Sequence, residues 1–242
     1  MGWSRVELAG KTADWFTPEG TTATRTAIFL HGYDGVTLRD NPAYSAACQL
    51  RNLRVLCPHG PRCWWSDTVY PPFHEEISPV EFLARKLPRF LAAQGEQDSS
   101  LAVFGVEMGG QGALQLAYRH ARQFPVVAAI SPKIDLDDWH GEGTSLDQLF
   151  PDRESARQAT ATLHIHPLDW PRHQLLLCDP ADIYCRDGIE ILASKLSSSG
   201  IPYDSDFATS HGGYGWNYAN AMAPRVIDFL TAAQDQESRR IS

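Results

Sequence analysis

Short apolar runs alternate with amphipathic stretches along almost the whole chain. Each apolar run has the length of a β-strand and is nearly unbroken, as expected for strands that are covered on both faces of a sheet. These runs lie at 25–31, 53–58, 101–104, 126–131 and 174–179, and a further strand is predicted at 203–209. Looser alternation over residues 1–18 predicts a hairpin at the edge of the sheet.

The amphipathic segments between these runs predict helices. They lie at 40–52, 78–91, directly after the glycine-rich turn at 105–110, and at 188–199 and 218–233. Because strand and helix alternate over the full length, we expect one α/β domain, residues 1–242, with a mostly parallel, twisted sheet and helices on both faces. The polar stretch 133–173 carries one short helical pattern near 153–160, and it is where a lid or pocket rim would lie.

Composition and charge narrow the classes of function. The chain has 242 residues, 43% hydrophobic and 21% charged, which is typical of a soluble globular protein. A formal net charge of −8 disfavours nucleic acid and anionic membrane surfaces as partners, since both need a basic face. No apolar run is long enough to span a bilayer, no signal peptide is visible, and the five cysteines lack the spacing of a zinc site. A cytoplasmic location is therefore expected.

The chemistry of the chain centres on residues 101–118. An apolar strand is followed at once by a glycine-rich turn and a helical pattern, which forces the residue at the turn into a strained, outward-pointing conformation. Gly105 and Gly109 leave room for strand and helix to approach each other closely. The motif for this geometry is G-x-S-x-G with a nucleophilic serine at its tip, but here it reads Gly105-Val-Glu-Met-Gly109. Glu107 therefore stands where the serine is expected.

Other segments bring reactive residue types to the same edge of the predicted sheet, because ligands bind beyond the carboxyl ends of parallel strands. The segment His-Gly-Tyr-Asp-Gly at 31–35 directly follows a strand. Asp179 and Asp182 follow another strand, and a glycine-rich loop with His211 and Tyr214 precedes the last helix. Turn, acid and histidine thus occur in the chain order of a hydrolase triad.

On these motifs, and over nearly its whole length, the chain resembles the α/β-hydrolases of the esterase D, S-formylglutathione hydrolase and feruloyl-esterase group, whose turn reads G-x-S-M-G-G. The resemblance implies the hydrolysis of carboxylic esters and a small-molecule, ester-like ligand. It also implies an oxyanion hole made by the backbone N–H groups of Tyr33 and Met108. By position, Asp182 matches the triad acid of the group, and Asp179 is the reserve candidate.

The chain departs from this group at the nucleophile and in the loop that should carry the histidine. In relatives of this kind, Trp or Tyr often follows the catalytic histidine by two residues. Counting back two residues from Trp216 leads to Tyr214 rather than to His211. Two alternatives remain: His211 serves as the base through a longer loop, or the catalytic histidine has become Tyr214.

Three roles are open for Glu107. Its carboxylate would face the oxyanion-hole amides and a helix N-terminus, which favour negative charge, so it could occupy the hole permanently and block the site. It could instead be a nucleophile, as is the aspartate of haloalkane dehalogenases and epoxide hydrolases, or a general base acting on water. Two classes of function follow: an active hydrolase, and a non-catalytic ligand-binding protein that has lost ordinary serine-esterase activity.

Aromatic residues and histidines provide weaker signals. Trp64, Trp65 and Trp216 are candidates for the apolar wall of a substrate pocket, although packing in the core is the commoner fate of such residues. The histidines at 164–166 and His173 have no acidic or cysteine partner at ligand spacing, so neither a metal nor a cofactor is expected. The sequence does not specify an oligomeric state.

Overall fold

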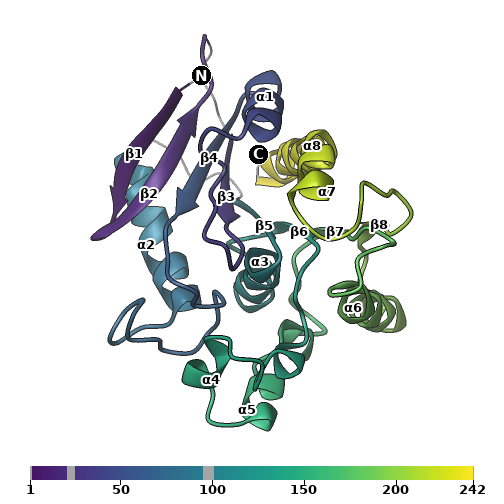
Figure 1. Ribbon diagram of the computed structural model, residues 1–242. Helices are drawn as coiled ribbons and strands as arrows, with labels where there is room; N and C mark the ends of the chain where they lie inside the picture. The colour runs from purple at the N-terminus through teal and green to yellow at the C-terminus, as the bar shows by residue number, and fades with distance from the viewer. Residues whose placement is uncertain (1, 21–24, 95–100, 242) are drawn as a thin grey trace.

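The computed structural model describes residues 2–20, 25–94 and 101–241, and in these ranges the chain forms an eight-stranded sheet of order β1-β2-β4-β3-β5-β6-β7-β8 (Figure 1). The strands from β3 to β8 pair in parallel; they are β3 (Arg25–Leu30), β4 (Leu53–Pro58), β5 (Ala102–Val106), β6 (Val126–Ile130), β7 (His173–Leu177) and β8 (Asp204–Asp206). The predicted edge hairpin, β1 (Gly2–Leu8) and β2 (Lys11–Thr17), joins β4 in antiparallel orientation. The prediction of an α/β fold with a mostly parallel sheet is confirmed.

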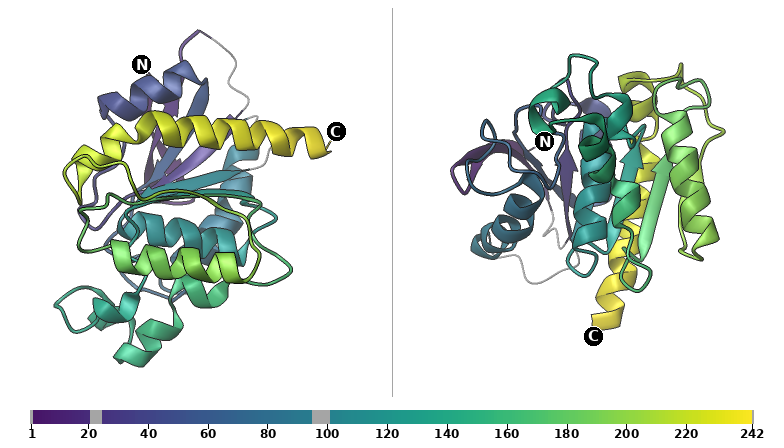
Figure 2. Two further views of the ribbon diagram at one scale, coloured as in Figure 1. Left: turned by 90° about the vertical axis from the view of Figure 1, so that its right-hand side faces the viewer. Right: turned by 90° about the horizontal axis from the view of Figure 1, so that it is seen from below.

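Helices cover both faces of this sheet (Figures 1 and 2). One face carries α1 (Pro42–Leu50), α7 (Trp216–Ala221) and α8 (Ala223–Ile241), and the other carries α2 (Pro79–Ala93), α3 (Met108–Arg119) and α6 (Arg186–Ser198). The side chains of Asn41 and Ser78 cap α1 and α2 directly before a proline. No helix within the described ranges is both long and apolar enough to cross a membrane.

Neighbouring residues along each strand point to opposite faces, which is why the strands are apolar at nearly every position. In β3, Ile28 and Leu30 belong to the core beneath α2, α3 and α6, whereas Ala27 and Phe29 belong to the core beneath α1, α7 and α8. The two cores hold the central strands rigidly, so residues at the carboxyl ends of these strands have fixed positions.

The structure differs from the prediction at the C-terminal helix. The segment predicted as one helix at 218–233 forms two, α7 and α8, which meet at Met222. α8 then continues well past residue 233, and Glu237 within this extension is fully buried, where it accepts hydrogen bonds from Arg172 and His173. The extension is rich in polar residues, so hydrophobic periodicity gave no signal for it.

The stretch 133–173 is more regular than predicted. Besides α5 (Arg153–Gln158), which matches the predicted helical pattern, it forms three short elements: η1 (Leu136–Asp138), α4 (Leu146–Leu149) and η2 (Ala161–His164). Buried apolar side chains from these elements join the core on the α3 side of the sheet. Its role as a lid or pocket rim stays a prediction.

Candidate active site

The turn between β5 and α3 consists of a single residue, Glu107, at the carboxyl edge of the sheet. Its φ of 55° and ψ of −117° lie in a region that side-chain-bearing residues rarely adopt. Its N–H donates to the carbonyl of Ile130 at 3.0 Å, and its own carbonyl accepts from the N–H of Lys133 at 3.2 Å. The prediction of a strained strand-to-helix turn at Glu107 is confirmed.

Three glycines make this turn sterically possible. A Cβ atom on Gly109 would lie 1.9 Å from the carbonyl oxygen of Leu30, and one on Gly105 would lie 2.3 Å from the backbone of Gly109. Both distances are far below contact, so any side chain would push α3 away from the sheet. A Cβ on Gly32 would lie 2.6 Å from Oε2 of Glu107, so this glycine leaves the space that the carboxylate fills.

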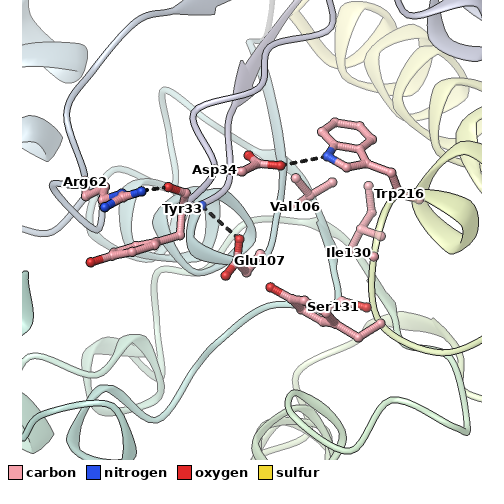
Figure 3. A pocket seen from close by; sticks show the side chains of 11 residues that line it. Tyr33, Asp34, Arg62, Val106, Glu107, Ile130, Ser131 and Trp216 are labelled. Carbon is pink, nitrogen blue, oxygen red and sulfur yellow. Dashed lines mark hydrogen bonds between the residues drawn. The ribbon is translucent and has the colours of Figure 1, made fainter. Parts of the chain in front are cut away.

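The Glu107 carboxylate is engaged at both oxygens. Oε2 accepts a hydrogen bond from the backbone N–H of Tyr33 at 2.8 Å (Figure 3), and Oε1 lies 2.7 Å from Nζ of Lys133. The side chains of Glu107 and Lys133 are each only 13% exposed, so water screens this ion pair weakly. Within the described residues, the Met108 N–H makes no hydrogen bond to the carboxylate, so one of the two predicted amides contacts it.

Aromatic rings hold Lys133 in place. Its Nζ lies 3.8 Å from the ring centroid of Trp139 and 5.4 Å from that of Tyr214, within the range of cation–π attraction. Tyr184 packs edge-on against Tyr214 with centroids 5.3 Å apart. Lys133 was not among the predicted site residues, although its position just after a strand that neighbours β5 was an available signal.

The loop after β8 brings Tyr214, and not His211, to Glu107. Partial burial, followed by hydrogen bonding to Glu107 and the charge of Glu107, raises the pKa of Tyr214, so its phenol is protonated at neutral pH. The side chain of His211 is exposed, and no hydrogen bond or ion pair joins its ring to the part of the chain that the structure describes. Of the two positions considered for the triad histidine, 211 and 214, only 214 lies at the site, and it carries tyrosine.

The predicted acid Asp182 is buried and binds local backbone. One of its oxygens accepts from the N–H groups of Tyr184 and Cys185 at 2.9 and 3.0 Å, and the thiol of Cys178 lies 3.7 Å from the other. In the described structure, no hydrogen bond links Asp182 to His211. Asp182 therefore binds the backbone that follows it, and its role as a triad acid stays a prediction.

The reserve acid, Asp179, fixes the course of the loop. Its carboxylate is fully buried and accepts hydrogen bonds from the Ser210 hydroxyl and from the N–H groups of His211 and Gly213. Burial raises the pKa of Asp179. The backbone hydrogen bonds, including one from Ala181, lower it by more than burial raises it, so the pKa lies below its usual value. This carboxylate binds the loop backbone and does not face the pocket.

A cavity of about 310 Å³ opens beside Glu107 (Figure 3). Trp216 lines it, as predicted, and donates from Nε1 to a carboxylate oxygen of Asp34 at 2.9 Å. Trp64 and Trp65 do not line this cavity, because both are fully buried. Their indole N–H groups bind Ser145 and the carbonyl of His31, so these two residues belong to the core rather than to the predicted pocket wall.

The other candidate histidines lie apart from the site. His173 contacts Glu237, and His164 contacts the carbonyl of Gln158. Among the residues that the structure describes, no three potential metal ligands of the His, Cys, Asp or Glu type converge.

Comparisons with known proteins bear on this fold and site. Residues 72–175 match the family model described as "Putative esterase". An S-formylglutathione hydrolase from Agrobacterium tumefaciens superposes with a TM-score of 0.74 over 98% of this chain and 94% of that chain, at 14% identity. The chain therefore has the α/β-hydrolase fold, and its residues 72–175 are similar in sequence to an esterase family.

Two further solved structures share this fold. A ferulic acid esterase has a TM-score of 0.75 at 15% identity, covering 96% of this chain and 98% of that chain. The fluorophosphonate-binding serine hydrolase F of Staphylococcus aureus has a TM-score of 0.73 at 14% identity, covering 95% and 96%. A search of curated protein sequences finds no match. At these identities, the structural likeness establishes the fold of the chain and does not establish its chemistry.

Proposed function

We propose that this esterase-like protein binds a small molecule in the Glu107 pocket and does not hydrolyse esters by the serine pathway. The observation that carries the proposal is the 2.8 Å hydrogen bond from the Tyr33 N–H to the Glu107 carboxylate. In serine esterases of this fold, an amide at this position stabilises the oxyanion that develops in the transition state. A carboxylate that holds the amide permanently takes the place of that oxyanion.

The contacts of Glu107 also argue against the carboxylate as a nucleophile. Attack on a substrate carbon would require one oxygen to leave either the Tyr33 amide or Lys133, and each contact stabilises the resting carboxylate. A covalent ester would then have to be hydrolysed by a water that a base activates. Tyr214, the candidate nearest to Glu107, is protonated at neutral pH because its pKa is raised. Tyr214 is therefore not suited to activate water for the second step.

Ester hydrolysis and active-site labelling test this proposal directly. We expect the native protein neither to hydrolyse p-nitrophenyl butyrate above background nor to react with a serine-directed fluorophosphonate. Glu107→Ser combined with Tyr214→His should gain both properties, since a general base and an oxyanion hole each contribute a factor on the order of a hundred or more. Glu107→Ser alone should stay nearly silent, because triad members act as a unit.

Two controls separate the alternatives. Adding His211→Ala to the double variant should leave its activity unchanged if position 214 provides the base, and should abolish it if His211 does. Glu75→Ser, at an exposed position, controls for a new serine that is not at the turn. Ester turnover by the native protein that disappears in Glu107→Gln would contradict the proposal and identify Glu107 as the reacting group.

A further inference from the structure

The cavity beside Glu107 combines an apolar interior with a charged mouth (Figure 3). Buried aliphatic side chains of Val106, Ile130 and Ala219 belong to its lining. Asp34 and Arg62 line the same cavity and are exposed, so a ligand that arrives from solvent can reach both charges. At about 310 Å³, the cavity lies near the lower end of the range for small-molecule sites, which begins at about 300 Å³. Its size therefore favours a small ligand with one apolar group.

The charged side chains in and beside this cavity differ in how they are compensated. Glu107 and Lys133 form an ion pair with each other, at 2.7 Å. Asp34 and Arg62 form no ion pair, either with each other or with any other residue that the structure describes. The mouth therefore offers one negative and one positive group to a ligand, whereas a charged ligand at Glu107 would have to break an existing pair.

Contacts within the protein fix the direction of the Asp34 carboxylate. One oxygen accepts from the backbone N–H of Val36 at 3.0 Å, and the other accepts from the Trp216 indole at 2.9 Å. Each carboxylate oxygen has two lone pairs, so both oxygens keep the capacity to accept a further hydrogen bond. Asp34 can therefore bind an ammonium group without losing either contact.

The guanidinium of Arg62 is held in a similar way. Its Nε donates to the Tyr33 carbonyl at 3.1 Å, and its central carbon lies 4.5 Å from the centroid of the Tyr33 ring. Within the described ranges, its two terminal nitrogens donate no hydrogen bond. Terminal guanidinium nitrogens match the geometry of a carboxylate, and a side chain that is already held in place loses little conformational freedom on binding.

We infer, on the basis of the proposed binding function, that the cavity binds a small zwitterion, namely an amino acid with an apolar side chain. The carboxylate of the ligand binds the terminal nitrogens of Arg62, its ammonium group binds Asp34, and its side chain packs on the aliphatic interior. A ligand with only one charge would leave either Asp34 or Arg62 without a partner and would be repelled by that same residue. The two opposite charges together therefore select for a zwitterion.

Three ligands that share a phenyl group separate the two charges. L-Phenylalanine carries both, phenethylamine lacks the carboxylate, and 3-phenylpropanoate lacks the ammonium group. Binding to the native protein is followed through the indole N–H resonance of Trp216, assigned by its loss in Trp216→Phe, because this N–H contacts Asp34. We expect the Kd of L-phenylalanine to be at least about five-fold lower than that of either analogue, since each analogue loses one contact between opposite charges.

Variants of the two charged residues test the assigned contacts. Arg62→Gln should raise the Kd of L-phenylalanine and of 3-phenylpropanoate about five-fold without weakening phenethylamine. Asp34→Asn should raise the Kd of L-phenylalanine and of phenethylamine about five-fold without weakening 3-phenylpropanoate. General damage to the cavity would weaken all three ligands. Arg89→Gln on α2 and Asp204→Asn on β8, at exposed positions outside the cavity, should change no Kd.

The outcomes separate the zwitterion assignment from the proposed function. The assignment is overturned if either analogue binds as tightly as L-phenylalanine, if a variant of Asp34 or Arg62 changes all three Kd values equally, or if L-phenylalanine does not shift the Trp216 resonance. The comparison of ligands on the native protein needs no substitution, so it decides the matter even if a variant fails to fold. Ester hydrolysis through Glu107 by a protein that still binds L-phenylalanine through Asp34 and Arg62 would contradict the proposed function and leave the zwitterion assignment intact.

Discussion

The turn at Glu107 and the loop at 210–216 border the same cavity, but different forces fix them. Backbone packing fixes the turn, because Gly105 and Gly109 let α3 lie against the sheet at distances that no side chain tolerates. Hydrogen bonds to one carboxylate, that of Asp179, fix the loop. The turn therefore keeps its shape whatever residue stands at its tip, whereas the course of the loop from 210 to 213 depends on the Asp179 carboxylate.

This difference explains how the turn can present a residue other than serine. The turn holds Glu107 at strained dihedral angles, with glutamate where the motif has serine. In the loop, Asp179 binds the backbone on both sides of Gly212, which leaves the His211 ring exposed and places Tyr214 beside Glu107. Packing of α3 against the sheet restricts the backbone of the turn more strongly than it restricts the side chain at position 107.

The largest expected effect comes from adding one methyl group to each region. Gly109→Ala should lower the free energy of unfolding by at least about 3 kcal/mol, because its Cβ would overlap the backbone of Leu30. Gly212→Ala is the matched variant in the loop, where φ is +90° but nothing lies within 4 Å of the added Cβ, so only strain of about 1 kcal/mol is expected. Urea unfolding of both variants measures the contrast, and equal losses would refute it.

A smaller effect is expected from the ion pair at the tip of the turn. Lys133→Met leaves a shielded carboxylate without its cation and should lower the free energy of unfolding by about 2 kcal/mol. Glu107→Gln combined with Lys133→Met should restore at least half of this loss, since the unpaired charge is then absent. Urea unfolding of the two single variants and the double variant measures the interaction between Glu107 and Lys133. Lys86→Met on α2 is the control. An additive double variant would mean that the two side chains do not interact.

The smallest effect concerns the titration of the loop. The pKa of Asp179 is lowered in the folded protein, so its contribution to stability is complete above the ordinary carboxyl value of about 3.9 and is lost as pH falls through the lower, folded value. The amide resonances of His211 and Gly213 should therefore titrate with a midpoint below about 3.9. The amide of Gly105 in β5 should not follow this titration, and Asp179→Asn should abolish it. A midpoint at or above the ordinary value would show that these hydrogen bonds do not stabilise the carboxylate.

Sequence patterns predicted the parts of the molecule that short-range rules control. Apolar runs located the strands, and the glycine spacing located the strained turn. Lys133 was not predicted as a site residue, because its direction toward Glu107 depends on how β5 and β6 pair. Local sequence patterns do not specify this pairing. Trp64 and Trp65 were candidates for a pocket wall, yet both adopt positive φ and lie in the core. Apolar character does not distinguish a pocket wall from a core.

The carboxylate at the turn also has a genetic consequence. No glutamate codon becomes a serine codon through a single base change, and every amino acid that is one base away from glutamate lacks a hydroxyl group. A tyrosine codon, in contrast, becomes a histidine codon through one base change. Histidine at position 214 therefore needs fewer base changes than serine at position 107. Error-prone mutagenesis with single-base changes will sample histidine at 214 readily and serine at 107 almost never. A library that seeks hydrolysis from this scaffold must therefore replace codon 107 as a whole.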